Sequence, residues 1–174
     1  SDAVFLALPH GEAMKLAPAL VDAGKRVVDL SGDFRLRDPR LYPQWYHVEH
    51  PAPAWLTDAR VAYGLSEWCR EAIVKAKLVA NPGCYATSIL LAVLPLFQAG
   101  LVEDDAFIVD AKSGLSGAGR KAEVPLLFSE MSQNLRAYKV NQHQHMAGIC
   151  ATHKKAAIRT ASSRTYILHT RLPT

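Results

Sequence analysis

The fold is decided by the stretch Leu78-Val79-Ala80-Asn81-Pro82-Gly83-Cys84-Tyr85-Ala86-Thr87. This stretch joins a short apolar run, a Pro-Gly turn and the start of a helix. The helix predicted over residues 85–99 is apolar on nearly every face, which predicts burial. Cys84 at its start lies near unpaired backbone N–H groups, which favour the nucleophilic thiolate. Cys84 is therefore a candidate nucleophile, and the alternative is a small buried hydrophobic residue.

The composition of the 174 residues predicts a globular chain with a sizeable core, because 49% of them are hydrophobic. No apolar run approaches the roughly 20 residues of a membrane helix, and no secretory signal pattern is expected. The three cysteines are an odd number without CxxC spacing, so neither a disulfide framework nor a zinc site is expected. A cytoplasmic location fits this cysteine usage.

The charge of the chain is unevenly distributed along its length. Residues 1–130 hold 13 Lys and Arg against 16 Asp and Glu, whereas residues 131–174 hold 7 basic residues and no acidic one. A basic C-terminal stretch without carboxylates predicts either a poorly folded arm that favours polyanions or a segment foreign to the architecture before it.

Hydrophobic patterning predicts an open α/β sheet in the first half of the chain. Strands are expected at residues 3–8, 26–30, 61–63, 77–80 and 106–111, and helices at residues 12–23, 66–76 and 85–99. Ser66 is the expected N-cap of the second helix. The proline-rich residues 38–58 are expected to form a loop that its aromatic side chains pack down. Because residue 3 already enters a core strand, earlier strands are expected to be missing.

Two loops follow the ends of predicted parallel strands, where ligands bind in open α/β sheets. They are Pro9-His10-Gly11 and Ser31-Gly32-Asp33-Phe34-Arg35. Taken without other evidence, Asp33 and Arg35 are slightly better explained as a surface ion pair in a turn.

A third candidate site is the glycine- and serine-rich stretch from Lys112 to Lys121, which follows a predicted strand. Successive glycines let backbone N–H groups converge, serines donate hydrogen bonds and Arg120 adds a planar cation. An anion-binding loop is therefore preferred over a flexible linker. The stretch matches neither the P-loop nor the GxGxxG pattern.

His143 and His145 form a pair two residues apart, a spacing that suits metal ligands on a strand. No third or fourth ligand stands nearby in the sequence, so a metal site is the weaker interpretation. A histidine that acts as a base for Cys84 needs spatial rather than sequential proximity. The long gap between Cys84 and the pair therefore leaves this role open.

Together these motifs resemble the N-acetyl-gamma-glutamyl-phosphate reductases of the aspartate-semialdehyde dehydrogenase superfamily. The resemblance covers residues 3–145 in the family's order and is most specific in the blocks Asn81–Tyr85 and Ser113–Arg120. It implies an α/β fold, the C-terminal part of a Rossmann-like NADP-binding domain (residues 1–83) followed by part of a mixed α+β catalytic and dimerisation domain (residues 84–149). Residues 150–174 would be an atypical basic tail.

The resemblance also implies an activity in arginine biosynthesis, the NADPH-dependent reduction of N-acetyl-L-glutamyl 5-phosphate to the semialdehyde. Cys84 would attack the acyl phosphate to form a thioester, NADP(H) would supply the hydride, and His145 would serve as acid and base. The implied substrate-binding residues are Ser113, Gly114, Ser116, Gly117, Arg120 and Arg35. The implied cofactor-binding residues are Pro9, His10, Ser31 and Ser88, and no metal is implied.

Three departures from the family pattern qualify this interpretation. The N-terminal glycine-rich fingerprint is absent, Ala147-Gly148 stands where the family has Pro-Glu, and residues 150–174 match nothing in the family. We therefore expect an internal fragment that keeps the nucleophile and binds NADPH poorly, from a protein that forms homo-oligomers. The alternatives are a reductase of carrier-linked aminoadipyl phosphate in lysine biosynthesis, and a non-catalytic protein whose basic arm binds nucleic acid.

Overall fold

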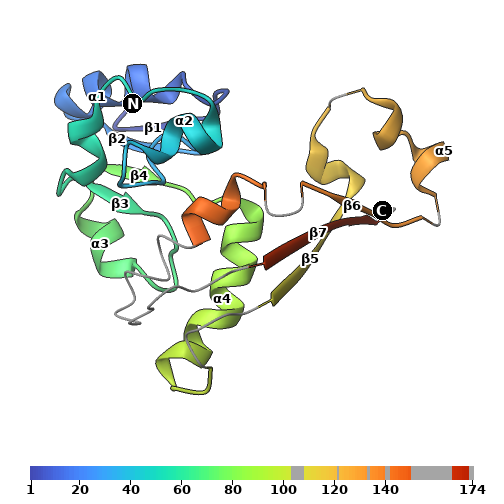
Figure 1. The fold of residues 1–174 in the computed structure, drawn as a ribbon. Helices are drawn as coiled ribbons and strands as arrows, with labels where there is room; N and C mark the ends of the chain where they lie inside the picture. The colour runs from blue at the N-terminus through green and yellow to red at the C-terminus, as the bar shows by residue number, and fades with distance from the viewer. Residues whose placement is uncertain (103–107, 121, 133, 140–141, 150–165, 173–174) are drawn as a thin grey trace.

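The computed structural model describes residues 1–102, 108–120, 122–132, 134–139, 142–149 and 166–172. Figure 1 shows a larger body built from the N-terminal residues and a smaller sheet built from later ones, with the long helix α4 (Cys84–Gln98) between them. In this described part, no helix has the length and apolar character that crossing a membrane requires.

The first sheet is parallel throughout, in the order β1-β2-β4-β3. Its strands are β1 (Ala3–Leu6), β2 (Arg26–Asp29), β3 (Val61–Tyr63) and β4 (Leu78–Ala80). The connections contain α1 (Ala13–Asp22), α2 (Leu41–Tyr46), the 3-10 helix η1 (Pro53–Thr57) and α3 (Arg70–Lys75). The predicted α/β class is confirmed, and the apolar strand sequences are typical of parallel sheets, although Phe5 of β1 is 69% exposed.

The core of the first sheet lies between its strands and helix α1. The side chains that α1 buries recur every three or four residues, so they share one face. They are Ala13, Met14, Ala17 and Val21. The same cluster holds the strand residues Leu6, Val27, Leu78 and Ala80. Burial of a side chain as large as Met14 contributes about 1.5–3 kcal/mol.

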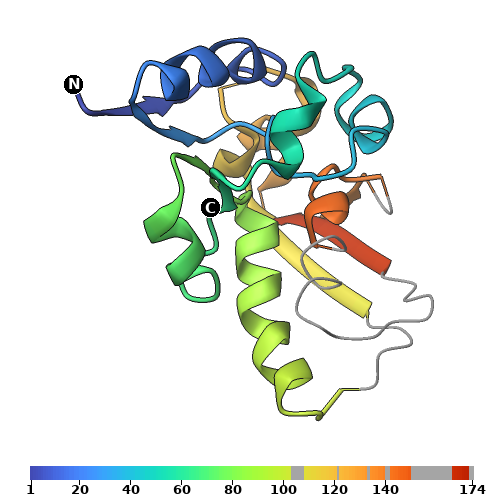
Figure 2. The same ribbon diagram turned by 90° about the vertical axis from the view of Figure 1, so that its left-hand side faces the viewer.

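The second sheet is mixed, in the order β5-β7-β6. Its strands are β5 (Ile108–Gly114), β6 (Arg136–Tyr138) and β7 (Tyr166–Leu172), with β5 parallel and β6 antiparallel to β7. Between β5 and β6 lie the short helices η2 (Leu115–Ala118), η3 (Val124–Leu126) and α5 (Phe128–Met131). Helix α4 runs beside β5 in both views (Figures 1 and 2), and its residues Leu90 and Leu94 pack in one cluster with Ile149.

Three local predictions are wrong. Helix α4 buries one face rather than nearly all of its surface, because Leu90 is inside while Leu96 is 43% exposed. Ser66 lies in a turn and caps no helix, since α3 begins at Arg70. Residues 38–58 contain α2 and η1 rather than only loop, although their aromatic packing is confirmed by the fully buried Tyr42.

Residues 166–172 correct the prediction of a poorly folded basic arm. They form β7, the central strand of the second sheet, paired from Ile108↔Tyr166 to Gly114↔Leu172 with β5 and also with β6. Ladder pairing satisfies backbone N–H and C=O groups whatever charge the side chains carry. The rest of the predicted tail, residues 150–165 and 173–174, lies outside the described residues.

Asp33 is a buried cap of helix α1 rather than half of a surface ion pair. Its carboxylate accepts hydrogen bonds from the backbone N–H of Gly11 at 2.8 and 3.0 Å and of Met14 at 2.9 Å. Glu12, the residue at the N-cap position, makes no side-chain cap. The negative charge that the helix N-terminus favours is thus supplied from the loop after β2.

Replacing Asp33 with alanine is expected to lower the free energy of unfolding by about 2 kcal/mol or more, because buried N–H groups of α1 lose their acceptor. Urea denaturation measures this loss. The control is Asp38→Ala, since Asp38 forms an exposed ion pair with Arg40. A loss no larger in Asp33→Ala than in the control would contradict the capping role.

His50 makes the stability of the first sheet depend on pH. It is 8% exposed, packs edge-on against Phe34 and Tyr42, and burial lowers the pKa of its imidazole below the ordinary value. The unfolded chain therefore binds this proton more tightly than the folded chain. Stability is complete above pH ~6.5 and falls as the pH decreases through that value towards the folded-state pKa.

The expected result is a urea midpoint that decreases between pH 7.5 and pH 5.5, with one linked proton contributing at most about 1.4 kcal/mol per pH unit. His50→Gln should show a shallower decrease. His47→Asn is the control, because His47 is exposed and its left-handed backbone (φ 57°) suits asparagine. Equal slopes in the wild type and His50→Gln would remove His50 as the cause.

Candidate active site

The corner between β4 and α4 places Cys84 at the first residue of a long helix, with its side chain exposed. The backbone N–H of Asn81 donates to the carbonyl of Asp29 at 2.8 Å, which ties the corner to the end of β2. Gly83 stands at the N-cap position, and no side chain caps the helix there. The N-terminal N–H groups of α4 therefore surround an accessible thiol, as the sequence predicts.

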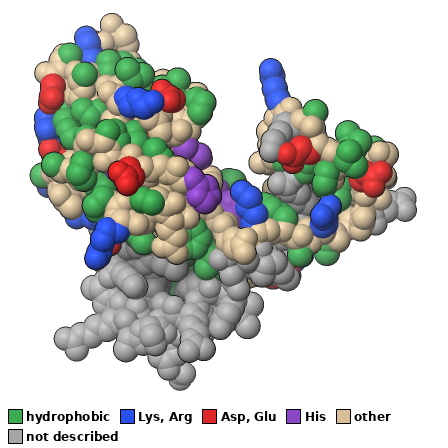
Figure 3. Space-filling view, turned by 45° about the horizontal axis from the view of Figure 1, so that its top comes forward, with side chains coloured by type: hydrophobic (Ala, Val, Ile, Leu, Met, Phe, Trp, Pro, Cys, Tyr) green, Lys and Arg blue, Asp and Glu red, His purple; other side chains and the backbone are tan. Residues whose placement is uncertain are grey.

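His145 lies directly against this corner. It begins a helical turn over residues 145–149, and a Cβ added at Gly83 would overlap with Nε2 of its imidazole. Gly83 immediately precedes Cys84, so the imidazole of His145 lies beside the residue next to the nucleophile. His145 and Cys84 are 61 residues apart in sequence. Histidine side chains gather where the larger body meets the smaller arm, as Figure 3 shows in purple.

Tyr85 and a second histidine lie beside His145. The ring of Tyr85 lies 5.4 Å from that of His143 and 6.0 Å from that of His145, in edge-on arrangements. His143 lies 4.6 Å from His145, and its Nδ1 accepts the backbone N–H of His145 at 3.2 Å. The Tyr85 hydroxyl is 3.0 Å from that of Tyr138 on β6. His143 lies between two turn residues and His145 begins a helical turn, so neither lies on a strand.

The pKa of Tyr85 is raised, first by burial and then by its hydrogen bond with Tyr138. The phenol therefore stays protonated at neutral pH. Sequence reasoning missed Tyr85 and Tyr138 as site residues. The only local signal was the position of Tyr85, one residue after the candidate nucleophile, because the Tyr138 contact depends on the second sheet.

The predicted anion-binding loop is built partly from a strand end and a 3-10 helix. Ser113 and Gly114 are the last residues of β5, and η2 takes in Ser116 and Gly117, with Arg120 exposed beyond it. The hydroxyl of Ser113 donates to the backbone carbonyl of Gly114 at 3.1 Å. This hydroxyl also occupies the position where a side chain at Gly117 would begin.

Arg35 supports the corner from the β2 side. Its guanidinium donates to the backbone carbonyl of Asn81 at 2.7 Å and to that of Leu30 at 2.9 Å. These bonds join the loop after β2 to the residues just before Cys84. A direct contact between Arg35 and a substrate stays a prediction.

The loops after β1 and β2 meet at His10. Its Nδ1 accepts the backbone N–H of Gly32 at 2.8 Å, and its Nε2 lies 3.1 Å from the side-chain amide of Gln144. Because Nδ1 accepts, a neutral His10 carries its proton on Nε2, so the Gln144 amide oxygen is the group that fits there. Burial and the charge of Arg35 lower the pKa of His10, which favours this neutral form.

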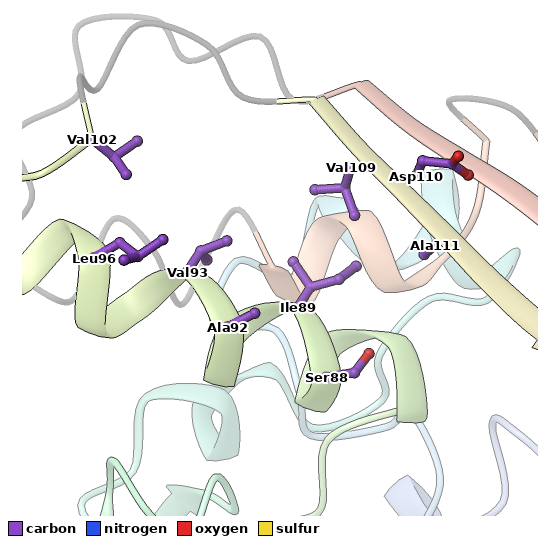
Figure 4. Close-up of a pocket in the computed structure, with 9 residues that line it drawn as sticks. All are labelled: Ser88, Ile89, Ala92, Val93, Leu96, Val102, Val109, Asp110 and Ala111. Atoms are coloured by element: carbon purple, nitrogen blue, oxygen red, sulfur yellow. The ribbon is translucent and has the colours of Figure 1, made fainter.

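Of the remaining predicted cofactor residues, Pro9 adjoins His10 and Ser31 is buried beside Asp33, whose N–H it accepts at 3.2 Å. Ser88 lies elsewhere, in an apolar groove between α4 and β5 that has a volume of about 450 Å³. Figure 4 shows it there with Ala92, Val109 and Ala111. None of the other three predicted cofactor residues lines this groove. Among the described residues, no group of three or more His, Cys, Asp or Glu could hold a metal ion.

Comparison with known proteins gives matches over nearly the whole chain. Residues 1–76 match the family model described as semialdehyde dehydrogenase, NAD binding domain, and residues 84–169 match the model described as semialdehyde dehydrogenase, dimerisation domain. By structure, the chain resembles aspartate semialdehyde dehydrogenase II from Vibrio cholerae (TM-score 0.63, 19% identity, 99% of this chain and 52% of that chain). It also resembles the enzyme with NADP from Candida albicans (TM-score 0.60, 13% identity, 99% and 47%).

By sequence, the chain is similar to proteins named N-acetyl-gamma-glutamyl-phosphate reductase. It is 55% identical over 148 residues to that of Geobacillus stearothermophilus and 51% identical over 149 residues to that of Bacillus cereus (strain 03BB102). These matches cover 85% and 86% of this chain, but only 42% and 43% of the relatives. The chain thus spans less than half the length of these relatives, and with both of its matched domains it belongs to the semialdehyde dehydrogenase family.

Proposed function

We propose that this chain carries the acyl-transfer centre of an NADPH-dependent reductase that converts N-acetyl-L-glutamyl 5-phosphate to the semialdehyde. The observation that carries the proposal is the imidazole of His145 lying against Gly83, immediately before the exposed Cys84. A thiol at a helix N-terminus beside an imidazole is the arrangement that activates a cysteine nucleophile. The similarity to N-acetyl-gamma-glutamyl-phosphate reductases supports this substrate.

In the proposed reaction the Cys84 sulfur attacks the acyl carbon while His145 takes the thiol proton. The bond between the acyl carbon and the phosphate oxygen breaks, phosphate leaves, and a thioester remains on Cys84. Ser113, Gly114, Ser116, Gly117 and Arg120 would hold the phosphate. Their position on β5 and η2 supports this role, because β5 packs beside α4, the helix that Cys84 begins.

The residues present fit one end of a dinucleotide. Pro9, His10 and Ser31 lie at the carboxyl ends of the adjacent strands β1 and β2, where the nicotinamide side would be held. The N-terminus of α1 is already filled by the Asp33 carboxylate, so it offers no site for the pyrophosphate. NADPH, when bound, supplies the hydride that reduces the thioester. A contact of Ser88 with the cofactor stays a prediction, because Ser88 lines the groove beside β5 and lies apart from the other three residues.

Binding of NADPH to this chain is expected to be weak, because Asp33 repels an anion from the nearest helix N-terminus. A fluorescence titration measures the dissociation constant. Asp33→Asn keeps the shape of the side chain and removes its charge, and it should bind NADPH no worse than the wild type. Tight binding by the wild type would show that the phosphates are held by groups other than those identified here.

We also propose that residues 1–83 and 84–149 are parts of two domains that meet at the β4–α4 corner, and that the protein acts as a homo-oligomer. The change of sheet at α4 supports the division. The description of the model that matches residues 84–169 as a dimerisation domain supports the assembly.

The test is direct observation of the acyl group on Cys84. The chain is mixed with N-acetyl-L-glutamyl 5-phosphate without cofactor, quenched in acid, and analysed by peptide mass spectrometry. We expect an acyl adduct on Cys84, none on Cys69, and an adduct that forms more slowly in His145→Ala. An adduct that forms faster with aminoadipyl phosphate would redirect the proposal to that substrate. A Cys84 that is readily alkylated but never acylated by either would overturn it.

A further inference from the structure

Tyr85 contacts both histidines of the proposed centre and Tyr138. It follows Cys84 in the first turn of α4 and is 6% exposed, so the helix and its surroundings fix its ring. The ring lies edge-on to both His143 and His145, with interplanar angles of 83° and 65°. The ring of Tyr138 also lies against that of His143, at 6.0 Å.

The ring of Tyr85 limits where the two imidazoles can move. An aromatic side chain has only two side-chain torsions, so once buried it is a rigid surface. His143 rests on this surface, and its Nδ1 accepts the backbone N–H of His145. Removing the ring would leave a space beside both imidazoles and permit His145 rotamers that no longer face Gly83.

The hydroxyl of Tyr85 makes a contact that does not involve the histidines. It forms a hydrogen bond with the hydroxyl of Tyr138 on β6, at 3.0 Å. One side chain of α4 is therefore joined to the second sheet. Loss of the hydroxyl alone leaves the ring contacts with the histidines in place.

We propose that Tyr85 is a positioning residue, whose ring holds His145 against Gly83 beside the nucleophile and whose hydroxyl attaches Tyr138 to α4. This inference rests on the proposed function, because it assigns Tyr85 an effect on the reactivity of Cys84 that is exerted through His145. It identifies a role for a side chain that does not itself touch the reacting atoms.

The experiment measures the rate at which iodoacetamide alkylates Cys84, by peptide mass spectrometry at pH 7. The variants are His145→Ala, Tyr85→Leu, Tyr85→Phe and the double variant Tyr85→Leu/His145→Ala. If His145 activates the thiol, His145→Ala should slow alkylation about tenfold. Tyr85→Leu should slow it by a similar factor, the double variant should be little slower than either, and Tyr85→Phe should restore the rate to within about threefold of the wild type.

The matched control is Phe97→Leu, which removes a buried ring near the other end of α4 and should leave the rate unchanged. Alkylation of Cys69 reports on folding in every variant. Should Tyr85→Leu fail to fold, nuclear Overhauser contacts from the Tyr85 ring to the carbon-bound protons of both imidazoles are measured in the wild type and in Tyr85→Phe, against Tyr138. Their presence supports the proposal and their absence overturns it.

The two ways of failing are distinct. No effect of His145→Ala would overturn the proposed function and this inference with it. A slow His145→Ala beside a fast Tyr85→Leu would overturn only the positioning role. If the slowing of alkylation in the double variant equalled the product of the two single slowing factors, the positioning role would also be overturned. Tyr85 would then act independently of His145.

Discussion

Replacing Cys84 with serine is expected to abolish transfer of the acyl group from the acyl phosphate. A serine hydroxyl is a far weaker nucleophile than a thiolate, and the acyl-transfer step has no other route in the proposed centre. The expected fall in the rate is about 10³-fold or more. Stability should hardly change, because the Cys84 side chain is exposed and makes no buried contact that serine would lose.

The measurement is release of inorganic phosphate from N-acetyl-L-glutamyl 5-phosphate in a single turnover, corrected for spontaneous hydrolysis. Cys69→Ser is the matched control, because Cys69 is also a cysteine at a helix N-terminus, the N-cap residue of α3. It should keep the wild-type rate. Phosphate release that persists in Cys84→Ser above the spontaneous rate would mean that another group receives the acyl chain.

The strands of the first sheet could be predicted from sequence because each is a short apolar run. In a parallel sheet both faces are covered, so burial leaves a signature that does not depend on neighbours. The start of α3 could not be predicted in this way. Leu65 is buried against α4, and the N–H groups of Trp68 and Cys69 both donate to its carbonyl, so a turn replaces the helix start that Ser66 suggested.

Asp33 shows why a charged loop residue was misread. In the sequence it stands near Arg35 in a turn, and a surface pair is the simplest local explanation. The groups that it caps, the N–H of Gly11 and of Met14, lie 22 and 19 residues away. Only the parallel pairing of β1 with β2 brings them together, and pairing is a property of the sheet rather than of the loop.

In the candidate centre, too, local features could be predicted from the sequence and long-range contacts could not. Cys84 was predictable because strand, turn and helix start are all local. The acid and base role of His145 could be predicted from the sequence, but its position could not. Nothing in the sequence indicates that its imidazole lies against Gly83. Gln144 was not identified at all, although it lies beside His10, because that contact joins loops 134 residues apart.

Gly83→Ala is expected to disable the centre without removing any reacting group. The backbone at Gly83 has φ −73° and ψ 160°, a region open to alanine, so the substitution imposes no backbone strain. The new methyl group would overlap with Nε2 of His145 and must displace the imidazole. A displacement of about 1 Å in a catalytic group can cost about 10²-fold in rate, and we expect a loss of that order in acylation of Cys84.

The matched control for Gly83→Ala is Gly148→Ala. Gly148 lies in the same helical turn as His145, and a Cβ there would meet only the Tyr63 hydroxyl, at an ordinary 3.7 Å. It should keep the wild-type rate of acylation. In a His145→Ala background, Gly83→Ala should cost little more, because the imidazole it displaces is gone. If Gly83→Ala slowed acylation equally in both backgrounds, its effect would come from the helix N-terminus itself, and the contact between His145 and Gly83 would have no part in activating Cys84.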